Sequence, residues 1–151
     1  MNNLSFHITD ITANSIRANA SEIGLSVEEQ DTRIVIRITD NGLGMDAETA
    51  RRVTNPFYTT RTTRKVGLGL PFLIQNAEQT GGSVTLTSEP GKGTKVRAVF
   101  HSDHIDCPPW GDLPGTVALL ITGNPEINVC FEYRSGETGY SISTNEIKEI
   151  L

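Results

Sequence analysis

Hydrophobic and polar positions along the chain predict an alternation of short helices and strands. Leu4, Ile8 and Ile11 recur at helical spacing and begin a predicted helix over residues 4–20. Alternating apolar and polar side chains predict strands elsewhere. The strands are expected at Glu22–Glu29, Thr32–Thr39, Ser83–Ser88, Thr94–His101, Asn128–Arg134 and Gly139–Ser143. Further helices are expected from Asp46 through Val53, from Gly67-Leu68-Gly69-Leu70 to Gln79, from Asp112 through Thr122, and from Thr144 or Asn145 onward.

Length and composition narrow the class of protein. At 151 residues the chain is long enough for one domain with a hydrophobic core. Its net charge of −5 argues against general nucleic-acid binding, which requires a basic face. No apolar run approaches the roughly 18 residues of a membrane span. Cys107 and Cys130 lack metal-binding spacing, so we expect two reduced thiols in a cytoplasmic protein.

The first candidate for chemistry is the turn that follows the apolar strand residues Ile36 and Ile38. Asp40 leaves this strand directly before Gly42 and Gly44, whose missing side chains allow unusual backbone conformations. A carboxylate in this position can accept a hydrogen bond from a flat ligand that carries an exocyclic amino group. Asp-Asn-Gly also forms ordinary turns, so the turn alone leaves both interpretations open.

A second candidate lies on the polar face of the first predicted helix. Asp10, Asn14 and Arg17 are spaced at i, i+4 and i+7 and therefore share one face. An Asn carbonyl oxygen is a hard ligand that suits Mg²⁺, Arg can bind phosphate, and Asp can orient a water molecule. A solvated helix face is the alternative interpretation.

The segment from residue 55 to residue 70 completes the set of candidates. Its aromatic start at Phe57 and Tyr58 is followed by hydroxyls and the cations Arg61, Arg64 and Lys65. Such a loop is either a solvated basic loop or a lid that closes over a polyphosphate. The glycines of the Gly67–Leu70 segment precede a helix N-terminus, where free backbone N–H groups suit phosphate.

Taken together, these motifs resemble the GHKL ATPases, which include the ATP-binding domains of bacterial sensor histidine kinases and the anti-sigma-factor kinases. The matching segments occur in the order that the family shows and cover roughly residues 4–101. They are the helix with Asn14, Asp40-x-Gly42-x-Gly44, Pro56-Phe57-Tyr58-Thr59-Thr60-Arg61, Gly67-Leu68-Gly69-Leu70 and Gly91-Lys92-Gly93-Thr94. The Pro-Phe-Tyr-Thr-Thr-Arg segment looks most like the histidine-kinase branch.

By this resemblance Asn14 binds Mg²⁺, Asp40 accepts the adenine amino group, and Thr94 helps to read adenine through water. Asp10 lies where hydrolytic members carry a Glu general base, and is one methylene shorter. His7 does not resemble a phosphoacceptor motif, so we expect a packed or surface histidine. Residue chemistry and resemblance together give ATP and Mg²⁺ as cofactors, Asp10 as the catalytic residue and the following nucleotide-binding set: Asn14, Arg17, Asp40, Gly42, Gly44, Met45, Phe57, Thr60, Arg61, Lys65, Gly67, Leu68, Gly69, Leu70 and Thr94.

The resemblance implies an α+β fold, a two-layer α/β sandwich of the Bergerat type with a mixed sheet under three helices. We expect residues 1–101 to form the histidine-kinase-like ATP-binding domain and residues 102–151 to form a C-terminal extension packed on it. The expected function is an ATPase or a histidine-kinase-like protein kinase in signal transduction. A non-catalytic, ATP-gated regulatory module is the alternative. The expected partner is a regulatory or phosphoacceptor protein, with a homodimer left open and neither nucleic acid nor a membrane span involved.

Overall fold

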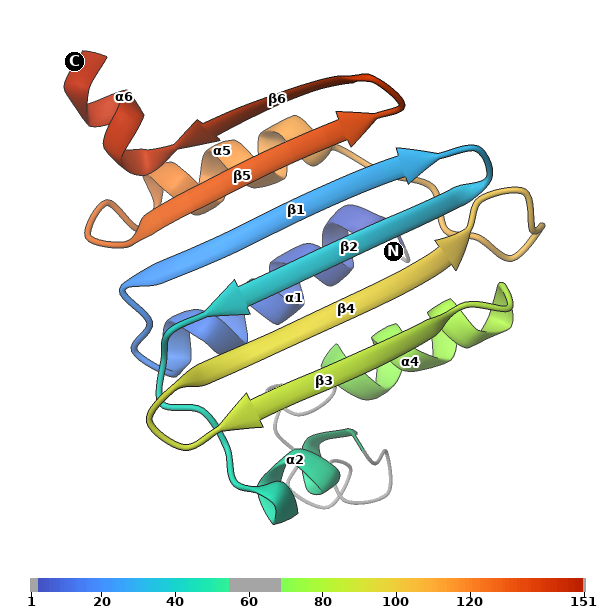
Figure 1. Cartoon of the computed structure of the whole chain (residues 1–151), viewed down its shortest axis with the longest axis horizontal. Coiled ribbons are helices and arrows are strands. Elements are labelled where there is room, and N and C mark those ends of the chain that lie inside the picture. Colours follow the sequence, from blue (N-terminus) through green and yellow to red (C-terminus); the bar gives the residue numbers. More distant parts are fainter. Residues whose placement is uncertain (1–2, 55–68, 151) are drawn as a thin grey trace.

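The computed structural model describes residues 3–54 and 69–150, which form one mixed sheet with helices packed against it (Figure 1). The strands are β1 (Glu22–Gln30), β2 (Arg33–Asp40), β3 (Ser83–Glu89), β4 (Gly93–His101), β5 (Asn128–Ser135) and β6 (Thr138–Ser143). The helices of the described part are α1 (Leu4–Arg17), α2 (Ala47–Thr54), α4 (Gly69–Gln79), α5 (Leu113–Thr122) and α6 (Thr144–Ile150). The predicted elements are therefore present, with shifted ends.

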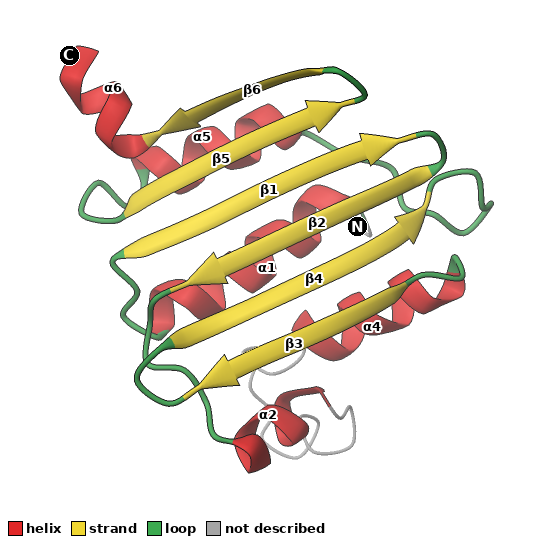
Figure 2. Cartoon of the chain, in the orientation of Figure 1, coloured by secondary structure: helices red, strands yellow, loops and turns green. Residues whose placement is uncertain are grey.

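The sheet has six strands in the order β3-β4-β2-β1-β5-β6. Strands β1 and β5 pair in parallel, and the other neighbouring pairs are antiparallel. Helices α1, α4 and α5 lie behind one face of this sheet in Figure 2, while α2 lies near β3 and α6 follows β6 at the other edge. The α+β sandwich with a mixed sheet under three helices is confirmed.

Alternation along the strands explains why the helices cover only one face. Ile23, Leu25 and Val27 of β1 are each 1% exposed and contribute to the core beneath the helices, whereas the intervening residues are half-buried or exposed. On the neighbouring strand β2, Ile36 and Ile38 join the same core. A period of two along β1 thus gives the sheet one buried face and one more exposed face, on which Val35 and its partner Val99 are still buried.

Helix α1 is shorter than the pattern predicts. It begins after Asn3, whose side chain caps the helix by accepting a hydrogen bond from the Phe6 N–H at 2.6 Å. It ends at Arg17 instead of residue 20, because Asn19 adopts a left-handed conformation with φ of 61°. The early end turns the chain back into β1.

The C-terminal residues continue the same sheet. Strand β5 extends it beyond β1, and Val117, Leu120 and Phe131 belong to the same hydrophobic cluster as the strands before them. The Leu4 N–H donates to the carbonyl oxygen of Pro109 at 2.8 Å, which ties this segment to the start of α1. None of the helices in the described ranges has the length and apolarity that a bilayer crossing requires. The division at residue 101 into a domain and an extension stays a prediction.

Candidate functional site

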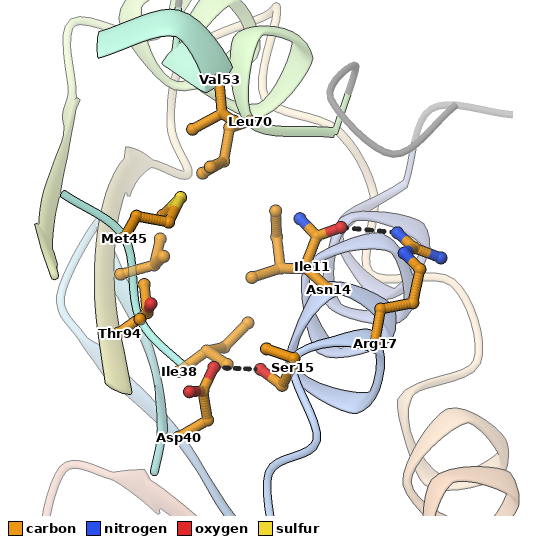
Figure 3. Close-up of a pocket in the computed structure, with 13 residues that line it drawn as sticks. Ile11, Asn14, Ser15, Arg17, Ile38, Asp40, Met45, Val53, Leu70 and Thr94 are labelled. Carbon is orange, nitrogen blue, oxygen red and sulfur yellow. Dashed lines mark hydrogen bonds between the residues drawn. The ribbon is translucent and has the colours of Figure 1, made fainter. Parts of the chain in front are cut away.

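A cavity of about 230 Å³ lies between α1 and the adjoining ends of β2 and β4 (Figure 3). Apolar side chains from α1, α2, α4 and the two strands form most of its walls, and polar groups gather near Asp40 and along α1. A cavity with apolar walls and few polar groups suits a flat heterocycle. The lining residues are Ile11, Asn14, Ser15, Arg17, Ala18, Ile38, Asp40, Gly44, Met45, Val53, Leu70, Thr94 and Val96.

Asp40 is the last residue of β2, and both of its carboxylate oxygens are held in place. The Ser15 hydroxyl donates to Oδ2 at 2.6 Å, and the Gly42 N–H donates to Oδ1 at 2.9 Å. Ser15 is only 2% exposed, and Figure 3 shows it facing Asp40 across one end of the cavity. Because each carboxylate oxygen has two lone pairs, the carboxylate can still accept a hydrogen bond from a ligand.

Thr94 lies beside Asp40 as its partner residue on the neighbouring strand β4. Its hydroxyl oxygen lies 2.8 Å from the Ser88 hydroxyl oxygen, and the Met45 N–H donates to that same Ser88 oxygen at 2.8 Å. Ser88 therefore connects β3, β4 and the loop that follows Asp40. The predicted pair Asp40 and Thr94 is brought together at one end of the cavity.

Two glycines explain how this loop fits against the turn between β3 and β4. Gly44 has a φ of +72°, and a side-chain Cβ there would lie 1.9 Å from the Glu89 carbonyl oxygen. At Gly93, with a φ of +110°, a Cβ would lie 2.0 Å from the Asp40 carbonyl oxygen. Both distances are far below van der Waals contact, so only glycine permits this approach of the two backbones.

The polar row of α1 forms another wall of the cavity. Arg17 Nη2 donates a hydrogen bond to Asn14 Oδ1 at 2.6 Å, and both residues line the cavity. Asp10, one turn earlier, is not among the lining residues in the described part of the chain. It lies beside the start of α4, where a Cβ on Gly69 would be 3.3 Å from the Asp10 Cβ. Burial raises the pKa of Asp10, and the nearby Arg17 charge opposes that rise.

Several predicted residues lie outside the described part of the chain. Phe57, Thr60, Arg61, Lys65, Gly67 and Leu68 all fall within residues 55–68. Of the predicted glycine segment, Gly69 begins α4 and Leu70 lines the cavity.

Sequence reasoning missed Ser15 and Ser88. Ser15 continues the apolar face of α1 that Ile8 and Ile11 begin, and Ser88 occupies the position on β3 where the inward alternation calls for an apolar residue. Each is a polar residue at a core-facing position of an amphipathic element, next to a motif residue. That signal is readable from the sequence, because buried polar groups need a partner.

His7 is a core residue. It is 1% exposed, its Nε2 lies 2.7 Å from the Asn76 side-chain nitrogen, and its ring centroid lies 5.3 Å from that of Phe72. Burial lowers the pKa of His7 to about 4. His7 therefore links α1 to α4 as a neutral side chain.

A cavity with one fixed carboxylate, two loops that require glycine and a row of polar side chains on a helix can accommodate a small, flat ligand that carries a hydrogen-bond donor. The sequence profile described as "Histidine kinase-, DNA gyrase B-, and HSP90-like ATPase" matches residues 3–104. The chain belongs to this ATPase family. Membership of the family implies that the domain binds ATP.

Curated relatives of the chain are bacterial sensor kinases. The chain is 29% identical over 104 residues to the sensor histidine kinase YxdK of Bacillus subtilis, covering 64% of this chain and 32% of that one. It is 30% identical over 101 residues to sporulation kinase C of the same organism, covering 66% and 23%. A putative sensor protein of Shewanella frigidimarina is 32% identical over 97 residues, covering 62% and 15%. The chain therefore spans less than a third of the length of each relative.

A solved structure shares the fold. It is the crystal structure of the N-terminal domain of a DNA repair protein, with a TM-score of 0.57 and 18% sequence identity. The alignment covers 95% of this chain and 52% of the other. At this identity the likeness concerns the fold alone.

Proposed function

We propose that the chain binds Mg-ATP in the cavity beside α1 and acts as a histidine-kinase-like ATPase domain in signal transduction. It would either transfer the terminal phosphoryl group to a partner protein or hydrolyse ATP slowly. The observation that carries the proposal is the Asp40 carboxylate, fixed by Ser15 and Gly42 next to Thr94. The kinase names of the relatives support the signalling role.

The adenine base fits the acceptor character of this end of the cavity. The 6-amino group of adenine is a donor, and an ionised carboxylate only accepts. A guanine carries a carbonyl oxygen at the same position, which would face the Asp40 carboxylate without a proton between them. Ile38 and Val96 provide apolar surface for the faces of the ring. ATP is thus favoured over GTP.

The phosphates and the metal would lie along the polar row of α1. In the described part of the chain no three His, Cys, Asp or Glu side chains are grouped as a metal site. A single amide oxygen on α1 would suit Mg²⁺ that arrives with the nucleotide, because Mg²⁺ usually takes one or two protein ligands and completes its shell with phosphate oxygens and water. Asn14 Oδ1 would be the protein ligand. Arg17 would then leave the Asn14 oxygen and pair with a phosphate.

Asp10 is the proposed general base. Its raised pKa brings the carboxyl group closer to the range in which it can take a proton from an attacking water or acceptor group. Its position beside Gly69 places it at the start of α4, where free backbone N–H groups suit phosphate. The proton of the nucleophile would pass to Asp10 as the new bond to the γ-phosphorus forms, while the bond from that phosphorus to the β–γ bridging oxygen breaks and ADP leaves.

The experiment that tests turnover compares the wild-type protein with Asp10→Asn, using γ-labelled ATP and candidate partner proteins. We expect labelled partner or labelled phosphate with the wild type, and loss of both with Asp10→Asn at unchanged ATP affinity. If the wild type shows neither phosphoryl transfer nor phosphate release above the blank, the proposal that the chain is an enzyme is rejected.

One observation favours a second candidate, an ATP-gated binding module without turnover. The side chain of Asp10 is shorter than Glu and does not line the cavity as far as the described residues form it. In that case Asp10→Asn would change neither ATP affinity nor partner binding, and Asp40→Asn would shift the effect of ATP on the partner to higher ATP concentrations. A partner affinity that is the same with and without ATP would reject this candidate.

A further inference from the structure

The Ser88 hydroxyl has three polar partners at the adenine end of the cavity. The Met45 N–H donates to Ser88 Oγ at 2.8 Å, the Gly93 carbonyl oxygen lies at 3.1 Å, and Thr94 Oγ1 lies at 2.8 Å. Ser88 is half-buried on the inward side of β3. It does not itself line the cavity, whereas Met45 and Thr94 do.

Counting donors and acceptors fixes the direction of these bonds. A serine hydroxyl has one proton and two lone pairs. The Met45 N–H can only donate and the Gly93 carbonyl can only accept, so the Ser88 proton goes to Gly93 and one lone pair goes to Met45. The remaining lone pair can only accept, and the Thr94 hydroxyl must therefore donate to Ser88. No other assignment satisfies all three contacts.

We propose that Ser88 is a positioning residue that determines base specificity by fixing the polarity of the Thr94 hydroxyl. With its proton directed to Ser88, Thr94 presents only lone pairs to the cavity. Asp40 and Thr94 are partners on neighbouring strands, so the base meets two acceptors side by side. This pair matches the two protons of the adenine 6-amino group, directly or through a water, and opposes a 6-oxo purine. The inference rests on the proposed function, in which this cavity binds adenine.

The test measures the affinities for ATP and inosine triphosphate, which carries an oxygen in place of the 6-amino group, by calorimetry. In Ser88→Ala the Thr94 hydroxyl is free to rotate and donate to that oxygen. The preference for ATP over inosine triphosphate should therefore fall by roughly threefold to tenfold, the weight of one hydrogen bond. Ser88→Thr keeps the hydroxyl and should keep the preference. Thr87→Ala, at the neighbouring exposed position of β3, is the matched control.

A second variant separates polarity from packing. Thr94→Val removes the hydroxyl, so it should lower the preference by itself, and adding Ser88→Ala should then leave the ratio of the two affinities unchanged. If Ser88 only holds the loops together, Ser88→Ala weakens the binding of both nucleotides equally. The ratio of the two affinities then stays at the wild-type value, which overturns the inference. An unchanged ratio in Thr94→Val overturns it too, whether or not Ser88→Ala folds. A wild-type protein without any preference would instead reject the adenine site on which the inference rests.

Discussion

Asp40→Asn tests the base-recognition end of the cavity with a change of one atom type. The Gly42 N–H can only donate, so the asparagine oxygen must turn toward it and the amide nitrogen must turn toward Ser15. The Ser15 hydroxyl can reverse and accept from that nitrogen, and the fold should tolerate the change. The ligand then meets an amide that lacks the charge and has its only oxygen already engaged.

The expected cost in ATP binding follows from this geometry. A hydrogen bond to a charged group contributes roughly 1.5–3 kcal/mol, so we expect the binding free energy of ATP to fall by about 2 kcal/mol. This loss corresponds to an increase of about 30-fold in the dissociation constant. Calorimetric titration with Mg-ATP measures it directly. Asp31→Asn is the control, because Asp31 is exposed in the turn between β1 and β2 and has a φ of 57°, which asparagine also tolerates. An ATP affinity of Asp40→Asn within twofold of the wild-type value would show that Asp40 does not accept the adenine amino group.

Three further predictions concern metal, pH and backbone. Asn14→Ala should remove most of the Mg²⁺-dependent part of ATP affinity while the melting temperature without nucleotide stays nearly constant, since Asn14 is half-buried on a polar face; unfolding would make it a structural residue. Folding lowers the pKa of His7 from 6.5 to about 4, so the unfolded chain binds the proton more readily. The contribution of His7 to the free energy of unfolding is therefore complete above pH 6.5, and it falls by up to about 3 kcal/mol toward pH 4. Urea unfolding at several pH values should measure this fall, and His7→Gln should not show it. Gly44→Ala should unfold at a lower urea concentration than Gly91→Ala, because Gly91 has a similar φ of +79° but no atom within 4 Å of the added Cβ. Equal losses of stability in the two variants would refute the contact between residue 44 and Glu89.

The elements and the site were predictable from the sequence to different degrees. Period-two alternation places the inward residues of β1, since one face of that strand is buried and the other is not. In β2 the consecutive residues Ile34, Val35 and Ile36 are all buried, so the period does not by itself say which of them face the helices. The pairing of β5 with β1 is different, because no local pattern in Asn128–Ser135 specifies a parallel neighbour more than 100 positions earlier. That contact depends on tertiary packing of α5 and on bonds such as Leu4 to Pro109.

Motif order was sufficient to predict Asp40 and Thr94 as one recognition pair, and the register of β2 and β4 places them side by side. It did not predict what holds them, because a serine in an amphipathic segment looks like an interruption of the apolar face until its partner is known. Ser15 has its partner 25 residues away and Ser88 has one 43 residues away. Hydrogen bonds over such separations belong to the fold and not to any local segment.

Nitrogen–proton NMR of the labelled protein, titrated with Mg²⁺ and a non-hydrolysable ATP analogue, shows whether the nucleotide binds in this cavity. We expect saturable shifts of the backbone amides of Gly42, Met45 and Thr94, and much weaker shifts with the corresponding GTP analogue. We expect no comparable change at Cys130, which lies exposed on the opposite face of the sheet. Shifts centred on that opposite face, or no shift at Gly42 and Thr94 at saturating nucleotide, would mean that the nucleotide does not bind in this cavity.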